Sequence, residues 1–277
     1  MTASLVLVAT PIGNLGDLSA RAVETLTSAD AIACEDTRHT RKLLSAAGIL
    51  RKRLLAVHEH NEAAAADGIV ALLARGETVA LVTDAGTPAI SDPGARVVVA
   101  VVGAGFEVTC VPGPSALIVA LAVSGLPTER FVFEGFLPRS GRDRAARLSE
   151  IATERRTVVL YEAPQRILRT LVDLAAAAGG DRRCSISREL TKRFEETWRG
   201  PLSKALVRAE EIEPRGEYVI VLEGARPVAH AYDDNTILEL LVAARAGGLR
   251  TREAVDEVTH ATGRVRREVY AIATGSG

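Results

Sequence analysis

The chain has 277 residues, of which 47% are hydrophobic and 25% are charged, and its formal net charge is −1. This composition is ordinary for a folded globular protein, and the length suits one large domain or two average ones. A nearly neutral chain lacks the broad basic field with which some proteins coat nucleic acid indiscriminately, so that class of function is excluded.

The N-terminal segment contains an apolar run, Leu5–Ala9, that ends at a Thr-Pro pair and has no basic residues before it. We expect a strand there and not a signal peptide. No apolar stretch is long enough to span a bilayer. The three cysteines, Cys34, Cys110 and Cys184, are far apart in apolar, strand-like segments. They predict buried free thiols in a cytoplasmic protein that has no membrane partner.

Strand-like and helix-like segments alternate through the first 112 residues. The expected strands cover 5–9, 31–34, 54–57, 79–82 and 108–111, and the expected helices cover 18–29, 37–47, 63–74 and 95–104. Either Asp17 or Ser19 is expected to cap the first helix. The alternation predicts a mainly parallel sheet covered by helices, with a ligand outside the carboxyl ends of the strands.

The pattern changes after a helix of small residues at 115–124. Further strands are expected at 131–136, 157–161, 184–188 and 218–222, with helices at 142–152, 165–178 and 202–211. Three short helices are then expected at 236–245, 251–259 and 264–274, with Thr251 as an N-cap.

We therefore predict an α/β fold with domains at 1–116 and 117–226 and a helical module at 227–277. The module resembles a helix-turn-helix. The alternative is a plain helical tail that docks on the body or on a partner subunit.

The segment Asp84–Gly94 holds two Gly, two Pro, two Asp and two hydroxyl residues between a strand and a helix. Gly86 and Gly94 allow a positive φ and close backbone approach, whereas the prolines stiffen the path. Such loops commonly hold a ligand, and the alternative is a rigid turn with Asx caps.

Three other polar loops follow expected strands, namely Thr10–Asp17, Glu35–Arg38 and His58–Glu62. The carboxyl ends of parallel strands face one way, so we expect all four loops at one edge of the sheet. The glycine spacings exclude a dinucleotide fingerprint and a P-loop. His58 and His60 could pair, but no third ligand follows at a zinc-like spacing, and we expect no metal.

Basic residues cluster at three places despite the neutral average. One cluster spans Arg38–Arg53 without an acid, a second spans Arg139–Arg147, and a third spans Arg264–Arg267. Each could meet phosphates, and each could equally be the solvated face of a helix.

Six motifs in chain order resemble those of the ribosomal RNA small subunit methyltransferase I family, which has the tetrapyrrole-methylase fold of S-adenosylmethionine enzymes. They are Thr10–Leu15, Glu35–Arg38, His58–Glu62, Asp84–Gly94, Pro112–Ala116 and Arg188–Lys192. The resemblance spans about Leu5 to Gly224, and the helical end is similar to the family's helix-turn-helix-like end. It implies two α/β domains with the cofactor cleft between them, a homodimer, and 2′-O-methylation of a cytidine in the decoding region of 16S rRNA.

The resemblance also implies which residues line the S-adenosyl-L-methionine cleft. They are Pro11, Gly13, Asp84, Ala85, Gly86, Thr87, Ser91, Ser115, Ala116, Tyr161, Ala163, Pro214 and Gly216. Three positions depart from the usual family pattern, with Thr83 in place of Ser, Ser140 in place of a basic residue and Gln165 in place of His. The last departure argues against an essential imidazole there.

Methyl transfer to a ribose hydroxyl needs alignment, exclusion of water and help in removing the hydroxyl proton, because the hydroxyl is a poor nucleophile. The candidate side chains are Glu35, Asp36, His58, Glu59, His60, Glu189 and Lys192. We expect Glu35 or the pair His58 and Glu59 to orient or deprotonate the hydroxyl. Lys192 belongs to the same predicted catalytic set, and it is expected to bind a flanking phosphate. The alternative is that Glu35 and Asp36 cap the next helix and pair with Arg38.

The expected contacts to RNA are Arg38, Arg41, Lys42, Arg139, Arg264 and Arg266. The partner would be 16S rRNA or the assembled small ribosomal subunit. Two other function classes stay open. One is a methyltransferase of the same fold that acts on a tetrapyrrole, and the other is a non-catalytic RNA-binding protein of the ribosome, which would not bind S-adenosylmethionine.

Overall fold

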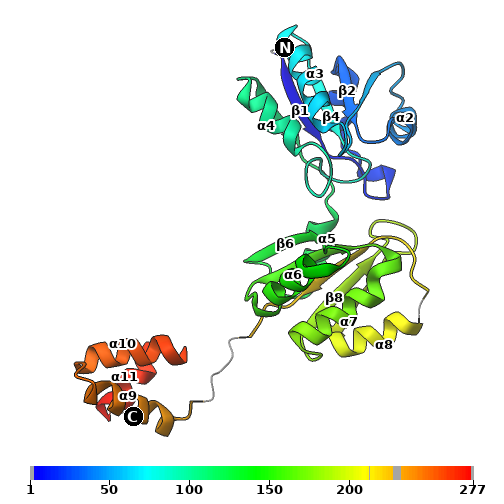
Figure 1. Cartoon of the computed structure of the whole chain (residues 1–277). Coiled ribbons are helices and arrows are strands. Elements are labelled where there is room, and N and C mark those ends of the chain that lie inside the picture. The colour runs from blue at the N-terminus through cyan, green and yellow to red at the C-terminus, as the bar shows by residue number, and fades with distance from the viewer. Residues whose placement is uncertain (1–2, 212, 227–231, 276–277) are drawn as a thin grey trace. The chain divides into compact units, whose positions relative to one another are not determined.

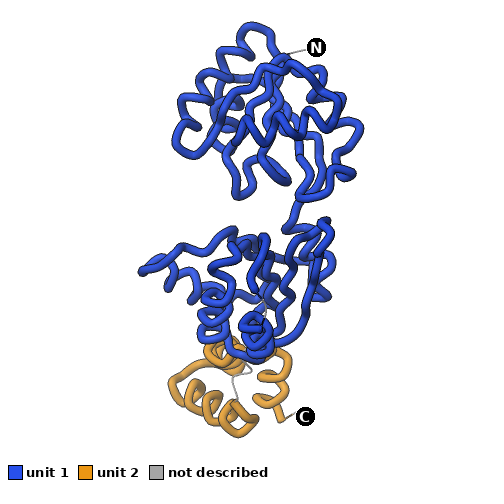
Figure 2. Tube along the Cα trace, turned by 90° about the vertical axis from the view of Figure 1, so that its right-hand side faces the viewer, with its two compact units in different colours: residues 1–225 blue, residues 226–277 orange. Residues whose placement is uncertain are grey.

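The computed structural model describes residues 3–211, 213–226 and 232–275. The chain divides into two compact units, 1–225 and 226–277, which are coloured separately in Figure 2. The first unit contains two five-stranded sheets. The predicted start of the helical module, at residue 227, lies outside the described residues.

The first sheet has the strand order β3-β2-β4-β1-β5, and all of its pairs are parallel, which confirms the prediction from the alternating pattern. Its strands are β1 (Ser4–Val8), β2 (Ala31–Cys34), β3 (Arg53–Ala56), β4 (Val79–Val82) and β5 (Glu107–Val111). Its helices are α1 (Ala20–Ser28), α2 (Thr37–Ala46), α3 (Glu62–Ala74) and α4 (Ala95–Gly103), with a short 3-10 helix, η1 (Leu15–Asp17), before α1.

The alternation of side chains along β4 explains why helices cover both faces of this sheet. Val79 and Leu81 lie in the core that α3 and α4 complete, whereas Ala80 and Val82 lie in the core that α1 and α2 complete. A strand buried on both faces must be apolar throughout. Polar groups that meet a ligand can therefore come only from the loops at the strand ends.

Short polar residues start the first two helices. The Ser19 Oγ accepts a hydrogen bond from the Ala22 N–H at 3.1 Å, so Ser19, and not Asp17, caps α1. The Asp36 Oδ1 accepts from the Arg38 N–H at 2.7 Å and caps α2. The polar loop after β2 therefore has a structural role as well as any functional one.

The second sheet is mixed, with the order β6-β7-β10-β8-β9, one parallel pair between β6 and β7, and antiparallel pairs elsewhere. Its strands are β6 (Phe131–Phe136), β7 (Thr157–Glu162), β8 (Arg183–Arg188), β9 (Glu196–Pro201) and β10 (Tyr218–Leu222). The helices are α5 (Ala116–Val123), α6 (Gly141–Thr153), α7 (Ile167–Ala178) and α8 (Leu202–Glu211), with a 3-10 helix, η2 (Pro164–Arg166). Helices α6, α7 and α8 cover one face and α5 covers the other (Figure 1).

Strand β9 is the element that the sequence analysis missed. Its six residues, Glu-Thr-Trp-Arg-Gly-Pro, contain two charges, a glycine and a proline. The strand lies at the edge of the sheet and pairs only with β8. An edge strand tolerates such residues because one side of its backbone needs no partner, so its sequence carries little strand signal.

The second unit is a three-helix module of α9 (Asp234–Ala246), α10 (Thr251–Thr262) and α11 (Arg266–Thr274). Gly263, with φ +68°, makes the left-handed turn between α10 and α11. The expectation that Thr251 is the N-cap is wrong. Arg250 holds that position, and its N–H donates to the Glu253 carboxylate at 2.8 Å.

The expectation of three buried thiols is correct for Cys34 and Cys184 and wrong for Cys110, which is exposed on the edge strand β5. An edge position removes the neighbouring strand that would have covered it. Among the described residues, no helix combines the length and apolar character needed to cross a membrane.

The basic cluster at 139–147 contains one arginine that is not available to a phosphate. Arg144 is 4% exposed. Its guanidinium lies 2.7 Å from the Asp173 carboxylate and donates to the Pro138 carbonyl and the Thr170 hydroxyl. It joins α6 to α7, whereas Arg142 is exposed.

We expect Arg144→Ala to lower the free energy of unfolding by about 3 kcal/mol, because the substitution leaves a half-buried carboxylate without its partner. The exposed neighbour supplies a matched control, and Arg142→Ala should change stability by less than about 0.5 kcal/mol. Urea denaturation followed by circular dichroism measures both. Equal effects of the two substitutions would contradict the structural role of Arg144.

Candidate active site

The first unit contains a cavity of about 290 Å³ lined by loops of both sheets. The first sheet contributes residues that follow β1, β2, β4 and β5, including Ile12, Glu35 and the segment 84–92. The second contributes Phe136, Tyr161 and the residues around Lys192. The cavity thus lies where the carboxyl ends of a parallel sheet are expected to bind a ligand.

The loop after β4 forms one wall and has an unusual backbone. Four of its residues have positive φ, namely Gly86 (88°), Ala89 (68°), Ser91 (60°) and Gly94 (133°). Two of these are not glycine, and such strain persists only where the surroundings enforce it. Paired backbone hydrogen bonds between Thr10 and Gly86, at 2.9 and 3.1 Å, join this loop to the end of β1.

Glu62 fixes the far end of the same loop. One carboxylate oxygen accepts hydrogen bonds from the Gly94 N–H at 2.8 Å and the Arg96 N–H at 2.9 Å, and the residue is 9% exposed. It therefore caps the N-terminus of α4, where a negative charge is favourable. Asn61 likewise braces the turn, since it accepts from the His58 N–H and donates to the Ala56 carbonyl. Asn61 and Glu62 of the His58–Glu62 motif therefore stabilise the structure of these loops.

Four carboxylates in the cavity wall have no cation partner among the described residues, namely Glu35, Asp84, Asp92 and Glu217. The Thr83 hydroxyl donates to Glu35 Oε2 at 3.2 Å, and the Asp36 N–H donates to Asp84 Oδ1 at 3.2 Å. Burial, followed by the charge of Glu35, raises the pKa of Asp92 to about 6. The cavity is therefore a strongly negative environment that favours a cationic ligand.

The sequence analysis did not single out Asp92 or Glu217 as site residues. Asp92 was within the recognised loop and could have been found by asking which of its side chains turn inward. Glu217 precedes β10, a strand of the second sheet, and no local signal tied it to the first sheet's loops. Only the meeting of the two sheets places these two carboxylates in one cavity.

The other two carboxylates of the cavity wall, Glu189 and Glu162, are paired with cations. Lys192 Nζ lies 2.8 Å from Glu189 Oε1, and both residues line the cavity. Glu162, which is 1% exposed, receives Arg166 at 3.2 Å and the Thr170 hydroxyl at 2.6 Å. The unbalanced negative charge is thus confined to the four carboxylates named above.

Tyr161 joins the second sheet to the helix that follows β5. Its hydroxyl oxygen accepts a hydrogen bond from the Leu117 N–H at 3.1 Å, at the start of α5. Its ring packs edge-on against Phe133 and Phe136, with centroid distances of 4.9 and 5.6 Å. Burial raises the pKa of Tyr161 above its usual value, so the phenol stays protonated.

Most of the residues expected to hold the cofactor lie in the cavity wall. The wall includes Asp84, Ala85, Gly86, Thr87, Ser91, Ser115, Ala116 and Tyr161. Gly13 and Gly216 lie behind it, because a side chain at Gly13 would meet Lys192 and one at Gly216 would meet Glu189. Pro11 and Ala163 do not line it. The cofactor role of all these residues stays a prediction.

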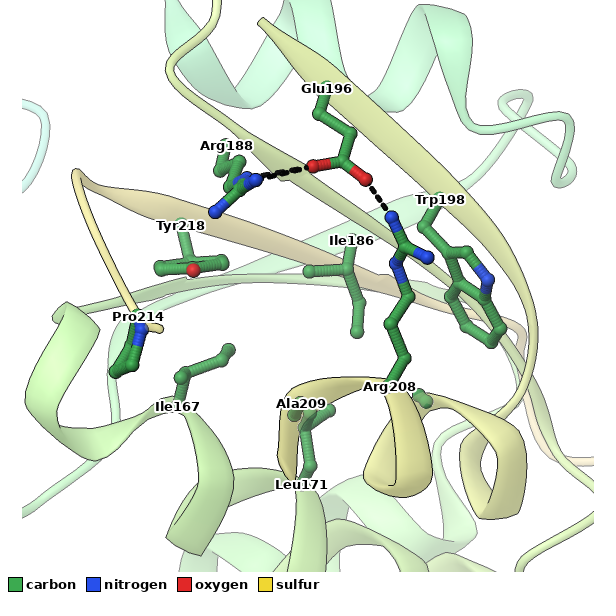
Figure 3. Close-up of a pocket in the computed structure, with 11 residues that line it drawn as sticks. Ile167, Leu171, Ile186, Arg188, Glu196, Trp198, Arg208, Ala209, Pro214 and Tyr218 are labelled. Atoms are coloured by element: carbon green, nitrogen blue, oxygen red, sulfur yellow. Dashed lines mark hydrogen bonds and ion pairs between the residues drawn. The ribbon is translucent and has the colours of Figure 1, made fainter. Parts of the chain in front are cut away.

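Pro214 lies in a second, smaller cavity of about 40 Å³ on the face of the second sheet that α7 and α8 cover. Figure 3 shows its apolar floor and the chain of ion pairs at its rim, in which Glu196 contacts Arg188 at 2.7 Å and also Arg208. Tyr218 borders both cavities. The two cavities therefore share one lining residue, which belongs to β10.

Among the residues expected to catalyse, Glu35 and Lys192 line the cavity, whereas His58 and Glu59 are exposed and do not. The reason is the strand order. His58 and Glu59 follow β3, which is an edge strand separated from β4 by β2. Strand β3 is thus one position farther from β4 than β2, whose loop supplies Glu35 to the cavity. The catalytic role of all four residues stays a prediction.

The residues expected to contact RNA fall into two groups. Arg38, Arg41 and Lys42 are exposed on α2, and their spacing places them on one face of that helix. The Arg38 guanidinium pairs with the Asp36 carboxylate at 3.2 Å. Arg139 is exposed three residues after Phe136. In the second unit the guanidinium groups are already paired, those of Arg264 with Asp234 and Glu268, and that of Arg266 with Asp256.

Two basic residues of the cluster at 38–53 make contacts within the fold and are therefore less available to phosphates. Lys52 donates to the Thr27 and Ala29 carbonyls, and Arg53 lies 3.3 Å from the Glu77 carboxylate. No group of three or more His, Cys, Asp or Glu side chains in the described part of the chain is arranged to hold a metal ion.

The raised pKa of Asp92 predicts how stability depends on pH. The unfolded carboxyl ionises near 3.8 and the folded one near 6, so this group makes the fold less stable as pH rises through that window. Because the group is partly open to solvent, we expect Asp92→Asn to stabilise the chain by about 1–2 kcal/mol at pH 8 and by almost nothing at pH 4.

Thermal or urea denaturation at the two pH values measures this difference, with Asp67→Asn on the exposed side of α3 as the control. A stabilisation by Asp92→Asn that is the same at both pH values would contradict the assignment.

Comparison with known proteins agrees with this geometry. A family model described as Tetrapyrrole (Corrin/Porphyrin) Methylases matches residues 4–206. A structure of uroporphyrin-III C-methyl transferase from Thermus thermophilus, complexed with S-adenyl homocysteine, has a TM-score of 0.54 and 18% identity over 80% of this chain and 97% of that chain. At this identity the likeness concerns the fold, and it confirms the tetrapyrrole-methylase-like α/β fold class expected from the sequence.

Closer likeness is found among sequence relatives. The protein named ribosomal RNA small subunit methyltransferase I in Synechocystis sp. is 45% identical over 269 residues, which cover 97% of this chain and 96% of that relative. The one so named in Xylella fastidiosa is 53% identical over 224 residues, which cover 80% of this chain and 82% of that relative. The chain therefore belongs to the ribosomal RNA small subunit methyltransferase I family of the tetrapyrrole methylases.

Proposed function

We propose that this chain transfers a methyl group from S-adenosyl-L-methionine to the 2′-hydroxyl of a cytidine in the decoding region of 16S rRNA. The observation that carries the proposal is a cavity in which four carboxylates have no cation partner within the described part of the chain. The names of the relatives in Synechocystis sp. and Xylella fastidiosa support the choice of small-subunit rRNA as substrate.

The cavity fits the charge of this cofactor. S-adenosylmethionine carries two positive groups, a sulfonium and an amine, and one carboxylate, so it is a net cation that relieves the repulsion among Glu35, Asp84, Asp92 and Glu217. Residues that would hold it are in the segment 84–92. When bound, the cofactor supplies an electrophilic methyl group on sulfur, and the protein needs chiefly to orient the acceptor and exclude water.

Glu35 is the wall residue that best fits the role of proton acceptor. The Thr83 hydroxyl holds its Oε2 at 3.2 Å, and Oε1 has no hydrogen-bond partner among the described residues. A carboxylate fixed at one oxygen and open at the other can receive the proton of a neighbouring hydroxyl. His58 and Glu59 are exposed outside the cavity. We therefore favour Glu35 over the pair His58 and Glu59 as the catalytic base.

Lys192 and the basic face of α2 are suited to the RNA backbone. Lys192 keeps about a third of its side chain exposed beside the cavity while it pairs with Glu189. Arg38, Arg41 and Lys42 extend this positive surface along the helix that follows Glu35. Phosphate contacts of this kind fix the register of a nucleic acid without reading its bases.

The proposal includes 16S rRNA or the assembled small subunit as partner, a homodimeric state and a cytoplasmic location. Two exposed valines on α4, Val99 at 72% and Val102 at 59%, support the homodimer, since a second copy would cover them. Light scattering after gel filtration tests the dimer.

Methyl transfer to small subunits that lack the modification tests the proposed reaction. At saturating S-adenosylmethionine we expect Glu35→Gln to lower the rate by about 10²–10⁴-fold, because the amide accepts no proton. The control is His58→Ala, which should stay within about twofold of the unsubstituted chain. No methylation by the unsubstituted chain would contradict the function, and full activity of Glu35→Gln would contradict the base.

The charge of the cavity predicts a preference for the sulfonium form of the cofactor. At pH 8 we expect Asp92→Asn to weaken S-adenosylmethionine binding roughly tenfold and to change S-adenosylhomocysteine binding much less, because that product lacks the positive sulfur. At pH 5, where Asp92 is largely protonated in the unsubstituted chain, the difference should nearly vanish. Calorimetry measures all of these affinities, and an equal loss for both ligands would rule out the electrostatic explanation.

A further inference from the structure

The loop between β8 and β9 exposes an aromatic ring beside the cavity. Phe194 is 71% exposed, more than any other Phe, Tyr or Trp among the described residues. It is two residues beyond Lys192, which lines the cavity, so the two Cα atoms are at most about 7 Å apart. A single exposed apolar side chain is common on protein surfaces. Exposure alone therefore does not distinguish Phe194 from other surface residues.

The loop that carries Phe194 is tightly held. Glu189 and Thr191 have positive φ, 51° and 66°, although neither is glycine. The Thr191 N–H donates to the Glu195 carboxylate at 2.7 Å, and backbone bonds of 3.0 and 3.1 Å link Lys192 to Glu189 and Glu195 to Lys192. A ring on a preorganised loop loses little conformational freedom when it binds a flat ligand.

Arg193 adds a cation to the same surface. Its guanidinium carbon lies 5.6 Å from the centroid of the Phe194 ring, within the range of a cation–π contact. One face of the ring therefore has a charged neighbour, while the side chain as a whole stays largely open. An aromatic face next to an arginine is the combination that proteins use to bind unpaired nucleotides, with stacking for the base and charge for the phosphate.

The proposed reaction creates a need for such a surface. In an A-form helix the 2′-hydroxyls lie along the minor groove between the two backbones. A target nucleotide that leaves the stack therefore brings its hydroxyl into the donor cavity more readily than one that stays in a helix. An unstacked base loses contact area, and a protein ring that replaces its former neighbour recovers that loss.

We propose that Phe194, with Arg193 beside it, is a positioning residue on which an unpaired base of the RNA substrate stacks next to the donor cavity. This inference rests on the proposed function, and it identifies Phe194 as a residue that recognises the RNA substrate. The ligand is a nucleobase of single-stranded or locally opened RNA, and the contact is independent of S-adenosylmethionine binding.

Methylation kinetics on small subunits lacking the modification test the proposal with three variants. We expect Phe194→Ala to lower kcat/KM for the subunit about tenfold, in the range found for loss of one stacked base, and Phe194→Trp to restore it. Val207→Ala removes an exposed apolar side chain from α8 and should have no effect. The affinity for S-adenosylmethionine should be the same in all of these proteins. Unchanged kcat/KM for Phe194→Ala, or failure of Trp to restore it, would overturn the proposal.

Tryptophan fluorescence separates this inference from the reaction itself. The unsubstituted chain has a single tryptophan, Trp198. A short unpaired RNA oligonucleotide should quench the fluorescence of the tryptophan introduced by Phe194→Trp, and it should leave the fluorescence of the unsubstituted chain unchanged. Quenching with no methylation by any protein would contradict the proposed function and leave the stacking contact supported. Methylation by the unsubstituted chain with no quenching would overturn the stacking contact alone.

Discussion

The architecture depends on holding in one cavity four carboxylates that have no cation partner among the described residues. Their mutual repulsion and their loss of water raise the pKa of Asp92 to about 6, so the fold must resist the tendency of the loops to move apart. It does so with the paired backbone bonds between Thr10 and Gly86, with Glu62 at the start of α4, and with a chain path that accepts positive φ at two non-glycine residues. These contacts keep the four carboxylates close together, and a cationic ligand can relieve their mutual repulsion.

Charge is arranged differently inside and outside this cavity. Inside, the uncompensated groups are negative, and the other carboxylates are already paired, Glu189 with Lys192 and Glu162 with Arg166. Outside, the exposed groups are positive on α2 and aromatic at Phe194. A methyl donor that is a cation and an acceptor that is a polyanion can therefore meet without competing for the same groups. The two substrates are separated by sign of charge as well as by position.

The success of the sequence analysis varied with how local the signal was. Strands buried on both faces, such as β4, are apolar throughout and were placed correctly, and so was the loop that follows β4. Strand β9, which contains two charges, a glycine and a proline, gave a weak signal and was missed. The predicted burial of Cys110 on the edge strand β5 was wrong. The basic cluster at 139–147 was recognised as a cluster, but its pattern could not reveal that Arg144 is buried against Asp173, because that partner is 29 residues away.

The sequence by itself determined the element order, the parallel first sheet and the loops that carry polar groups, because these follow from hydrophobic periodicity and from the residues that start and end helices. It also determined the family, through motifs in a fixed order. Only the tertiary structure decided which loops meet. The order β3-β2-β4-β1-β5 places the β2 and β4 loops together and leaves the β3 loop at the edge, and the second sheet brings Glu217 and Lys192 to the same cavity. Strand order and the meeting of two sheets arise from contacts distant in sequence, which no local pattern encodes.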